Sequence, residues 1–146
     1  MQILTTRFGP VTVEPQDRVD FPAGLVGLPQ LKRFILIRDP QVPGITWLQS
    51  TRDPAWAFAL VSPRSILPDY QVRASVEQLR PIDVQDSQDI EVYAILNRTV
   101  RQVTANLQAP VLINRRRLLG VQLVLSDSLY EMRHVVNWVA ELRMSA

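Results

Sequence analysis

The tripeptide Arg115-Arg116-Arg117 is the group of side chains best suited to binding a charged ligand. Guanidinium groups fork onto carboxylates and neutralise phosphates, so both an acidic protein and a nucleic acid are conceivable ligands. The footprint is small, however, no aromatic side chain for base stacking is near in the sequence, and a turn here needs polar residues in any case. A solvated turn is therefore our first interpretation, followed by contact with an acidic protein and then by RNA binding.

The remaining residue types give catalysis and metal binding no support. The sequence has one histidine, His134, and no cysteine, which excludes sites built on several imidazoles or on thiolates. His134 has no second ligand four residues away, so a structural role is the better interpretation. Gly24 and Gly27 are not followed by the Lys-Ser or Lys-Thr of a phosphate-binding loop. We expect a protein that is not an enzyme and that holds no cofactor or metal.

Charges are unevenly distributed along the chain. The net charge is +2, but four acids and no base lie between Asp83 and Glu91. The stretch from Val92 to Ser126 carries five arginines and no acid. Because the acidic stretch lacks the glycine that makes the sharp turn of a calcium loop, we interpret it as solvated surface. The pattern predicts one negative and one positive edge.

Short strands are predicted for most of the chain. Proline and glycine recur from Met1 to Pro81 too often for a long helix, since an interior proline breaks the helical hydrogen-bond ladder. Segments rich in branched and aromatic residues favour strands at Gln2–Phe8, Val11–Glu14, Arg18–Phe21, Phe34–Arg38, Ile45–Gln49, Trp56–Val61, Ile90–Leu96, Val111–Asn114 and Leu119–Leu125. The first two flank Gly9-Pro10 as a hairpin. Such a set predicts a mainly β fold, a small closed or partly closed antiparallel-rich barrel, because closure removes free edges.

Two segments have helical character. Ser75 can cap a short turn that runs through Leu79 and stops at Pro81. At the end of the chain, apolar residues at helical spacing predict a helix at about residues 128–144, capped by Asp127 or Ser128. Trp138 lies at the flank of its apolar stripe, either as part of the core or as an interface anchor.

The chain is expected to form a single domain over residues 1–146, because no linker or internal repeat divides it. Its first residues lack the charged start and apolar run of a signal peptide, and no stretch approaches the ~18 apolar residues of a membrane span. Together with the missing cysteines, this predicts a cytoplasmic protein that does not engage a membrane.

Short phrases in a fixed order resemble the flagellar assembly factor FliW family over nearly the whole chain. They are Thr6-Arg7-Phe8-Gly9, Phe21-Pro22-Ala23-Gly24-Leu25-Val26-Gly27-Leu28, Leu31-Lys32-Arg33-Phe34, Trp47-Leu48-Gln49-Ser50 with Asp53-Pro54, Pro68-Asp69-Tyr70, Thr104-Ala105-Asn106-Leu107-Gln108-Ala109-Pro110 with Ile113-Asn114, Gly120 with Gln122, and Asp127-Ser128 with Tyr130, Arg133 and His134. None of these phrases forms an activated nucleophile or an acid–base pair. Each is weak alone, but the ordered set is specific.

The resemblance implies a bacterial protein that binds flagellin and the RNA-binding translational regulator CsrA and exchanges one partner for the other. Binding of CsrA away from its RNA site, helped by negative charge that repels RNA, relieves repression of flagellin synthesis in that family. Here the net charge is positive, so only the acidic stretch from Asp83 to Glu91 offers local negative charge. We expect a free monomer with no direct nucleic-acid partner, and the alternative is a small RNA-binding module using the arginine turn. The expected partner-binding residues are Asp69, Tyr70, Asn106, Asn114, Arg115, Arg116, Arg117 and Tyr130.

Overall fold

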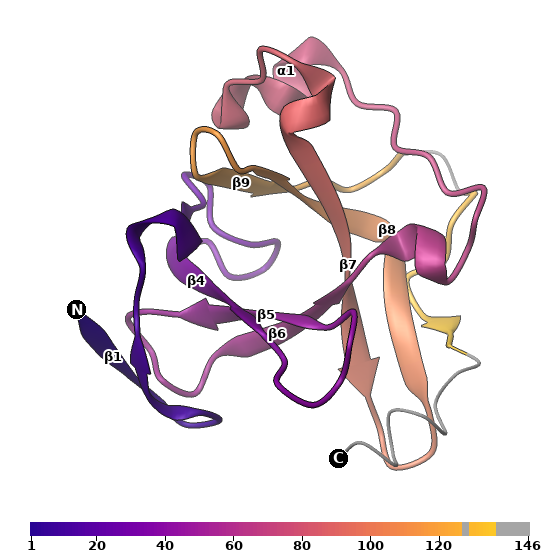
Figure 1. Cartoon of the computed structure of the whole chain (residues 1–146). Helices are drawn as coiled ribbons and strands as arrows, with labels where there is room; N and C mark the ends of the chain where they lie inside the picture. The colour runs from indigo at the N-terminus through magenta and orange to yellow at the C-terminus, as the bar shows by residue number, and fades with distance from the viewer. Residues whose placement is uncertain (127–128, 137–146) are drawn as a thin grey trace.

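Seven strands close into a barrel in the computed structural model, which describes residues 1–126 and 129–136 (Figure 1). They are β3 (Arg18–Asp20), β4 (Arg33–Arg38), β5 (Thr46–Ser50), β6 (Ala57–Val61), β7 (Ile90–Arg98), β8 (Val103–Asn114) and β9 (Leu119–Gln122). Neighbouring strands run antiparallel except β3 and β9, where Asp20 pairs with Leu119 in parallel orientation. Because β9 also pairs with β8, the pairing continues round the ring, and the predicted closed β-barrel is confirmed.

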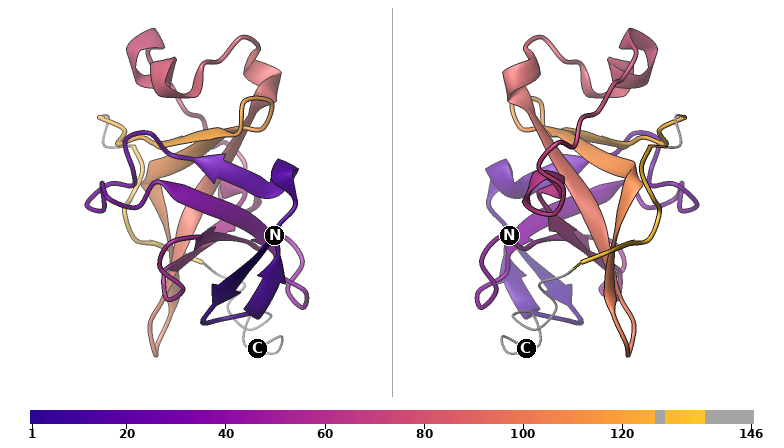
Figure 2. Two further views of the ribbon diagram at one scale, coloured as in Figure 1. Left: turned by 90° about the vertical axis from the view of Figure 1, so that its left-hand side faces the viewer. Right: turned by 90° about the vertical axis from the view of Figure 1, so that its right-hand side faces the viewer.

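The chain begins with a small hairpin outside the barrel, formed by β1 (Gln2–Thr5) and β2 (Gly9–Thr12). The hairpin is confirmed, but Gly9-Pro10 starts the second strand instead of forming the turn. The Thr5 hydroxyl donates to the Gly9 carbonyl at 2.8 Å and accepts from the Phe8 N–H, which closes the loop between the strands. The hairpin and the short helix α1 (Val76–Leu79) lie at opposite ends of the molecule (Figure 2).

β8 is the longest strand and pairs with three other strands. It pairs with β7 along its length, with β9 through Val111–Asn114, and with β10 (His134–Val135) through Thr104 and Ala105. Its register against β7 shifts between Tyr93 and Ile95. The sequence predicted only the last third of β8, Val111–Asn114. Pro110 lacks a backbone donor, and the irregular pairing next to it accommodates the proline within the strand.

The barrel wall is packed on both faces. Inside, the rings of Phe21 and Phe34 meet edge to face with centroids 5.2 Å apart, within a cluster of branched residues from the surrounding strands. Outside, the segment between β6 and β7 places Tyr70 and Ile82 against residues of β8. Burial on both faces explains why β8 is buried along almost its whole length, and why its sequence is continuously apolar from Ala109 to Ile113 although it alternates before that.

The predicted cap of α1 is confirmed. The Ser75 side chain accepts from the Gln78 N–H, and the Gln78 side chain accepts from the Ser75 N–H, which makes a reciprocal capping box. Pro81 does not end helical geometry outright, because residues Arg80–Ile82 continue as one of four 3-10 turns in the described part of the chain. The 3-10 turns are Pro15–Asp17, Pro63–Ser65, Arg80–Ile82 and Ser87–Asp89.

The helix predicted at about residues 128–144 is wrong for residues 129–136. These residues form turns followed by β10, where Val136 donates its N–H to the Val103 carbonyl at 2.9 Å. Pairing with β8 overrides the helical spacing, since Val136 is buried against the barrel and Tyr130 packs on the same cluster, whereas Leu129 and Met132 stay exposed. Asp127, Ser128 and Trp138, with the rest of the predicted helix, lie outside the described residues. Among those described, no helix is long and apolar enough to span a bilayer.

Candidate protein-binding surfaces

The arginine turn connects β8 to β9 and faces the acidic stretch. The Arg115 guanidinium lies 3.5 Å from the Glu91 carboxylate, that of Arg116 3.8 Å from Asp89, and that of Arg117 3.1 Å from Asp83. The prediction of separate positive and negative edges is therefore wrong, because pairing of β7 with β8 brings the two charge runs together. Each exposed pair contributes at most about 1 kcal/mol to stability, but together they cancel most of the local charge.

Asn114 holds this turn in place. Its side chain is buried, its amide nitrogen donates to the carbonyls of Ile82 and Asp83, and its oxygen accepts from the N–H groups of Arg116 and Arg117. One side chain thus joins the end of β8 to the 3-10 turn that follows α1. Asn114 is a framework residue here, and the guanidinium groups beyond it are the part that a partner can reach.

Tyr70, Tyr130 and Asn106 come together around the irregular part of β8. The buried Tyr70 hydroxyl donates to the Leu107 carbonyl at 2.7 Å, and its ring centroid lies 4.4 Å from that of Tyr130. The Asn106 side chain accepts from the N–H groups of Gln108 and Ala109 within the same strand. These contacts give Tyr70 and Asn106 supporting roles. Asp69 is exposed and Tyr130 half-buried, so these two remain on the surface.

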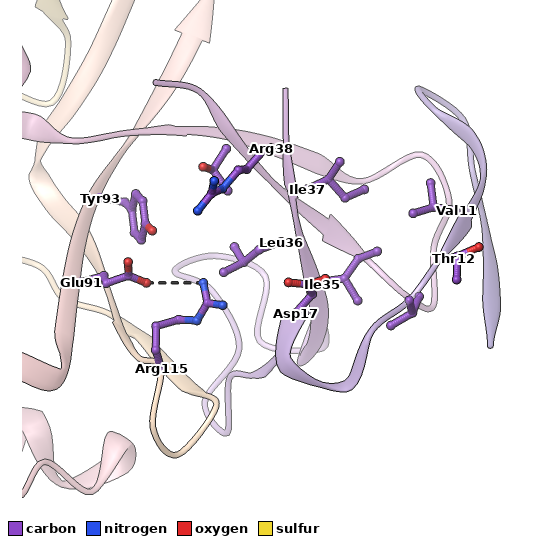
Figure 3. A pocket seen from close by; sticks show the side chains of 12 residues that line it. Val11, Thr12, Asp17, Ile35, Leu36, Ile37, Arg38, Glu91, Tyr93 and Arg115 are labelled. Carbon is purple, nitrogen blue, oxygen red and sulfur yellow. Dashed lines mark ion pairs between the residues drawn. The ribbon is translucent and has the colours of Figure 1, made fainter. Parts of the chain in front are cut away.

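A groove of about 420 Å³ lies between the N-terminal hairpin and the barrel (Figure 3). Its apolar lining comes from β2 and β4, including Val11, Ile35 and Ile37, and its charged lining includes Arg38 and Arg115. Of these residues, only Arg115 was expected from the sequence to bind a partner. The available signal was local: alternation within β4 places Ile35 and Ile37 on one face, and Arg38 ends that strand. That β2 and β4 form one groove required the tertiary structure.

Tyr93 stands in the charged part of the groove beside Glu91, two positions earlier on the same face of β7. Burial of the phenol, the negative charge of Glu91 and a hydrogen bond to that carboxylate raise the pKa of Tyr93 to about 12. The phenol therefore stays protonated at neutral pH and donates to Glu91, which Arg115 also contacts. Glu91 is shared between a phenol and a guanidinium.

The raised pKa of Tyr93 predicts a loss of stability at high pH. Because the folded protein disfavours the phenolate, the stabilisation is complete below the unfolded-state pKa of about 10 and is lost as the pH rises through about 12. We expect Tyr93→Phe to remove the most alkaline step from a spectrophotometric titration of tyrosine. If the variant instead lost a step near pH 10, Tyr93 would ionise normally in the folded protein.

His134 lies in β10 opposite Ala105 and is half-buried. In the part of the chain that the structure describes, no group of three or more histidine, aspartate and glutamate residues is placed to hold a metal ion. Three of the four acidic side chains of the 83–91 stretch contact arginines instead of converging on one point.

Comparison with known proteins places the chain in a family. The model of the FliW protein family matches residues 2–136. The flagellar assembly factor FliW of Moorella thermoacetica is 37% identical over 137 residues, covering 92% of this chain and 87% of the relative. That of Geobacillus kaustophilus is 35% identical, covering 92% and 94%. A crystal structure of the flagellar assembly factor FliW superposes with a TM-score of 0.85 at 32% identity, covering 92% of this chain and 96% of the other. This chain belongs to the FliW family.

Proposed function

We propose that this protein is a flagellar assembly factor that acts by binding two proteins in turn, flagellin and the translational regulator CsrA. The observation that carries the proposal is the match to the FliW family over residues 2–136, with relatives named flagellar assembly factors along nearly their full length. In this proposal, binding of CsrA relieves repression of flagellin synthesis, and accumulating flagellin then displaces CsrA. The protein works in the cytoplasm as a free monomer and catalyses no reaction.

The charges of the described residues support protein binding over RNA binding. Three of the four acids between residues 83 and 91 contact the three arginines of the turn, so neither run presents a strong field of one sign. RNA binding draws its affinity from cations that neutralise several phosphates at once. The same cancellation weakens local negative charge as a means of repelling RNA, so we propose an antagonism of CsrA that depends on contact and not on repulsion.

Titration of purified flagellin and purified CsrA against the protein tests this proposal by calorimetry. We expect one complex with each partner, and we expect added flagellin to release CsrA from a preformed complex. Size-exclusion chromatography with light scattering should give one chain mass for the free protein. Absence of both complexes contradicts the proposal, and a stable ternary complex contradicts partner exchange.

The arginine turn gives a separate prediction about RNA. Because its guanidinium groups are paired with carboxylates, we expect no retention of RNA at physiological salt, by the parent protein or by a triple variant with Arg115, Arg116 and Arg117 changed to Gln. Filter binding with a labelled RNA measures this. Retention by the parent that disappears in the triple variant would favour the RNA-binding module instead.

A further inference from the structure

The groove between the N-terminal hairpin and the barrel has two apolar strips at strand spacing. Val11 and Val13 are two positions apart on one side, and Ile35 and Ile37 are two positions apart on β4. Val13 and Ile35 are already buried, whereas Val11 and Ile37 are half-buried and line the accessible part. Alternate side chains of an extended segment repeat at the same spacing, so such a segment can place its aliphatic residues between the two strips.

The charged end of the groove has one cation without a counter-ion among the described residues. Arg115 contacts Glu91 at 3.5 Å and donates to the Gln16 carbonyl at 3.2 Å, and Glu91 also accepts from Tyr93. Arg38 lines the same end, is exposed, and forms no ion pair in the described part of the chain (Figure 3). The fourth charged group of the lining, Asp17, forms no ion pair with Arg38 in the described residues. Glu91 is occupied, so Arg38 is the group left to receive a carboxylate.

We propose that this groove is a docking site for an extended acidic segment of a protein partner, with a carboxylate on Arg38 and aliphatic side chains against Val11 and Ile37. Charge complementarity with Arg38 and the apolar strips together select alternating aliphatic and acidic residues. Nucleic acid fits this lining poorly, because the strips offer no aromatic face for stacking and Arg38 is a single free cation. The premise that the partner is a protein rests on the proposed function.

Fluorescence anisotropy with two labelled peptides tests the proposal. In the first peptide valine alternates with glutamate, and in the second glutamine replaces each glutamate. We expect the acidic peptide to bind the full chain at least about tenfold more tightly than the glutamine peptide, since about 1.4 kcal/mol of charge-assisted contact is at stake. Arg38→Glu should remove that preference. Equal binding of the two peptides, or no binding of either, overturns the proposal.

Arg33→Glu is the matched control, because Arg33 is an exposed arginine at the other end of β4 and outside the groove lining. It makes the same charge change on the same strand, so we expect it to leave peptide affinity within about twofold of the parent. Val11→Asp, which places a negative charge on the apolar strip, should weaken the acidic peptide as Arg38→Glu does. Equal losses in Arg33→Glu and Arg38→Glu would mean general electrostatic attraction and overturn the site.

Two further measurements separate this inference from the proposed function. An RNA that displaces the acidic peptide, and that Arg38→Glu no longer binds, overturns docking of a protein segment. Calorimetry with flagellin and CsrA is repeated with Arg38→Glu, and loss of at least one complex supports the site. Normal binding of both partners by Arg38→Glu, together with peptide binding that is indifferent to Arg38, overturns the inference alone. Absence of both complexes with the parent protein overturns the proposed function, whatever the peptides show.

Discussion

Gly24→Ala is expected to destabilise the protein by about 2–5 kcal/mol, a large part of the stability of a domain of this size. Gly24 has a φ of +70°, which costs an L-residue about 1–2 kcal/mol. A Cβ there would also lie 2.5 Å from the carbonyl oxygen of Pro29, a backbone atom that no side-chain rotation can remove. The overlap adds about 1–3 kcal/mol of forced displacement. Denaturant unfolding followed by circular dichroism measures the change.

Gly27→Ala is the control that separates the two contributions. Gly27 has a φ of +79°, but a Cβ at this position meets no atom within 4 Å. We expect this variant to lose only the backbone cost of about 1–2 kcal/mol. The difference between the two variants then reports the close approach of Pro29, which a Leu25–Leu28 bridge holds in place. Equal destabilisation would show that the loop moves to accommodate the added carbon.

Asn114→Ala is expected to destabilise the protein by about 3 kcal/mol, because Asn114 makes four hydrogen bonds from a buried position. Its removal leaves the Ile82 and Asp83 carbonyls without this donor, and a buried polar group without a partner costs about 1–3 kcal/mol. The arginine turn also loses both bonds to its N–H groups. We expect lower thermal stability, and faster hydrogen exchange of the Arg116 and Arg117 amides.

Asn97→Ala serves as the comparison for Asn114→Ala. Asn97 is an exposed residue of β7, and the same chemical change there should shift the free energy of unfolding by no more than about 0.5 kcal/mol. A large loss in both variants would point to a general effect of shortening asparagine in a strand. If Asn114→Ala keeps parental stability and parental amide exchange, the buried hydrogen bonds do not hold the turn.

Variants of the framework residues should change stability, whereas variants of the exposed binding residues should change binding. Gly24, Asn114, Tyr70 and Asn106 act on how the chain is held, through backbone geometry or buried hydrogen bonds. Arg38 is exposed and supports no neighbouring backbone in the described structure, so its reversal should alter binding and leave folding intact. Measuring unfolding beside binding for each variant therefore distinguishes a lost partner contact from a loosened barrel.

Local signals in the sequence were sufficient for most elements. Branched and aromatic runs located β3 to β7 to within a few residues, and Ser75 located the start of α1. The short phrases, taken in order, also identified the family. These features depend on neighbouring residues alone: side-chain branching, capping groups, and the fixed φ of proline. These features can therefore be predicted from the sequence without knowing which segments are in contact in the fold.

The segments that the sequence misjudged were decided by partners far along the chain. Residues 129–136 have helical spacing, yet β8 offers an edge with which β10 pairs, and that pairing outweighs the local preference. The sequence predicted separate edges for the acidic and basic runs because the residues that pair are far apart along the chain, 24 positions in the case of Arg115 and Glu91. Only the β7–β8 register brings these side chains together. Secondary-structure propensity depends on neighbouring residues, so it predicts neither the β8–β10 pairing nor these ion pairs.

The sequence by itself limits the possible chemistry, because it has no cysteine and a single histidine. Locating where binding can occur required the tertiary structure. The arginine turn, prominent in the sequence, is largely neutralised by carboxylates, whereas Arg38, at the end of an ordinary strand, stands unpaired among the described residues in a groove. Residue type determines what a side chain can do, but closure of the barrel determines which charges meet and which remain open to a partner.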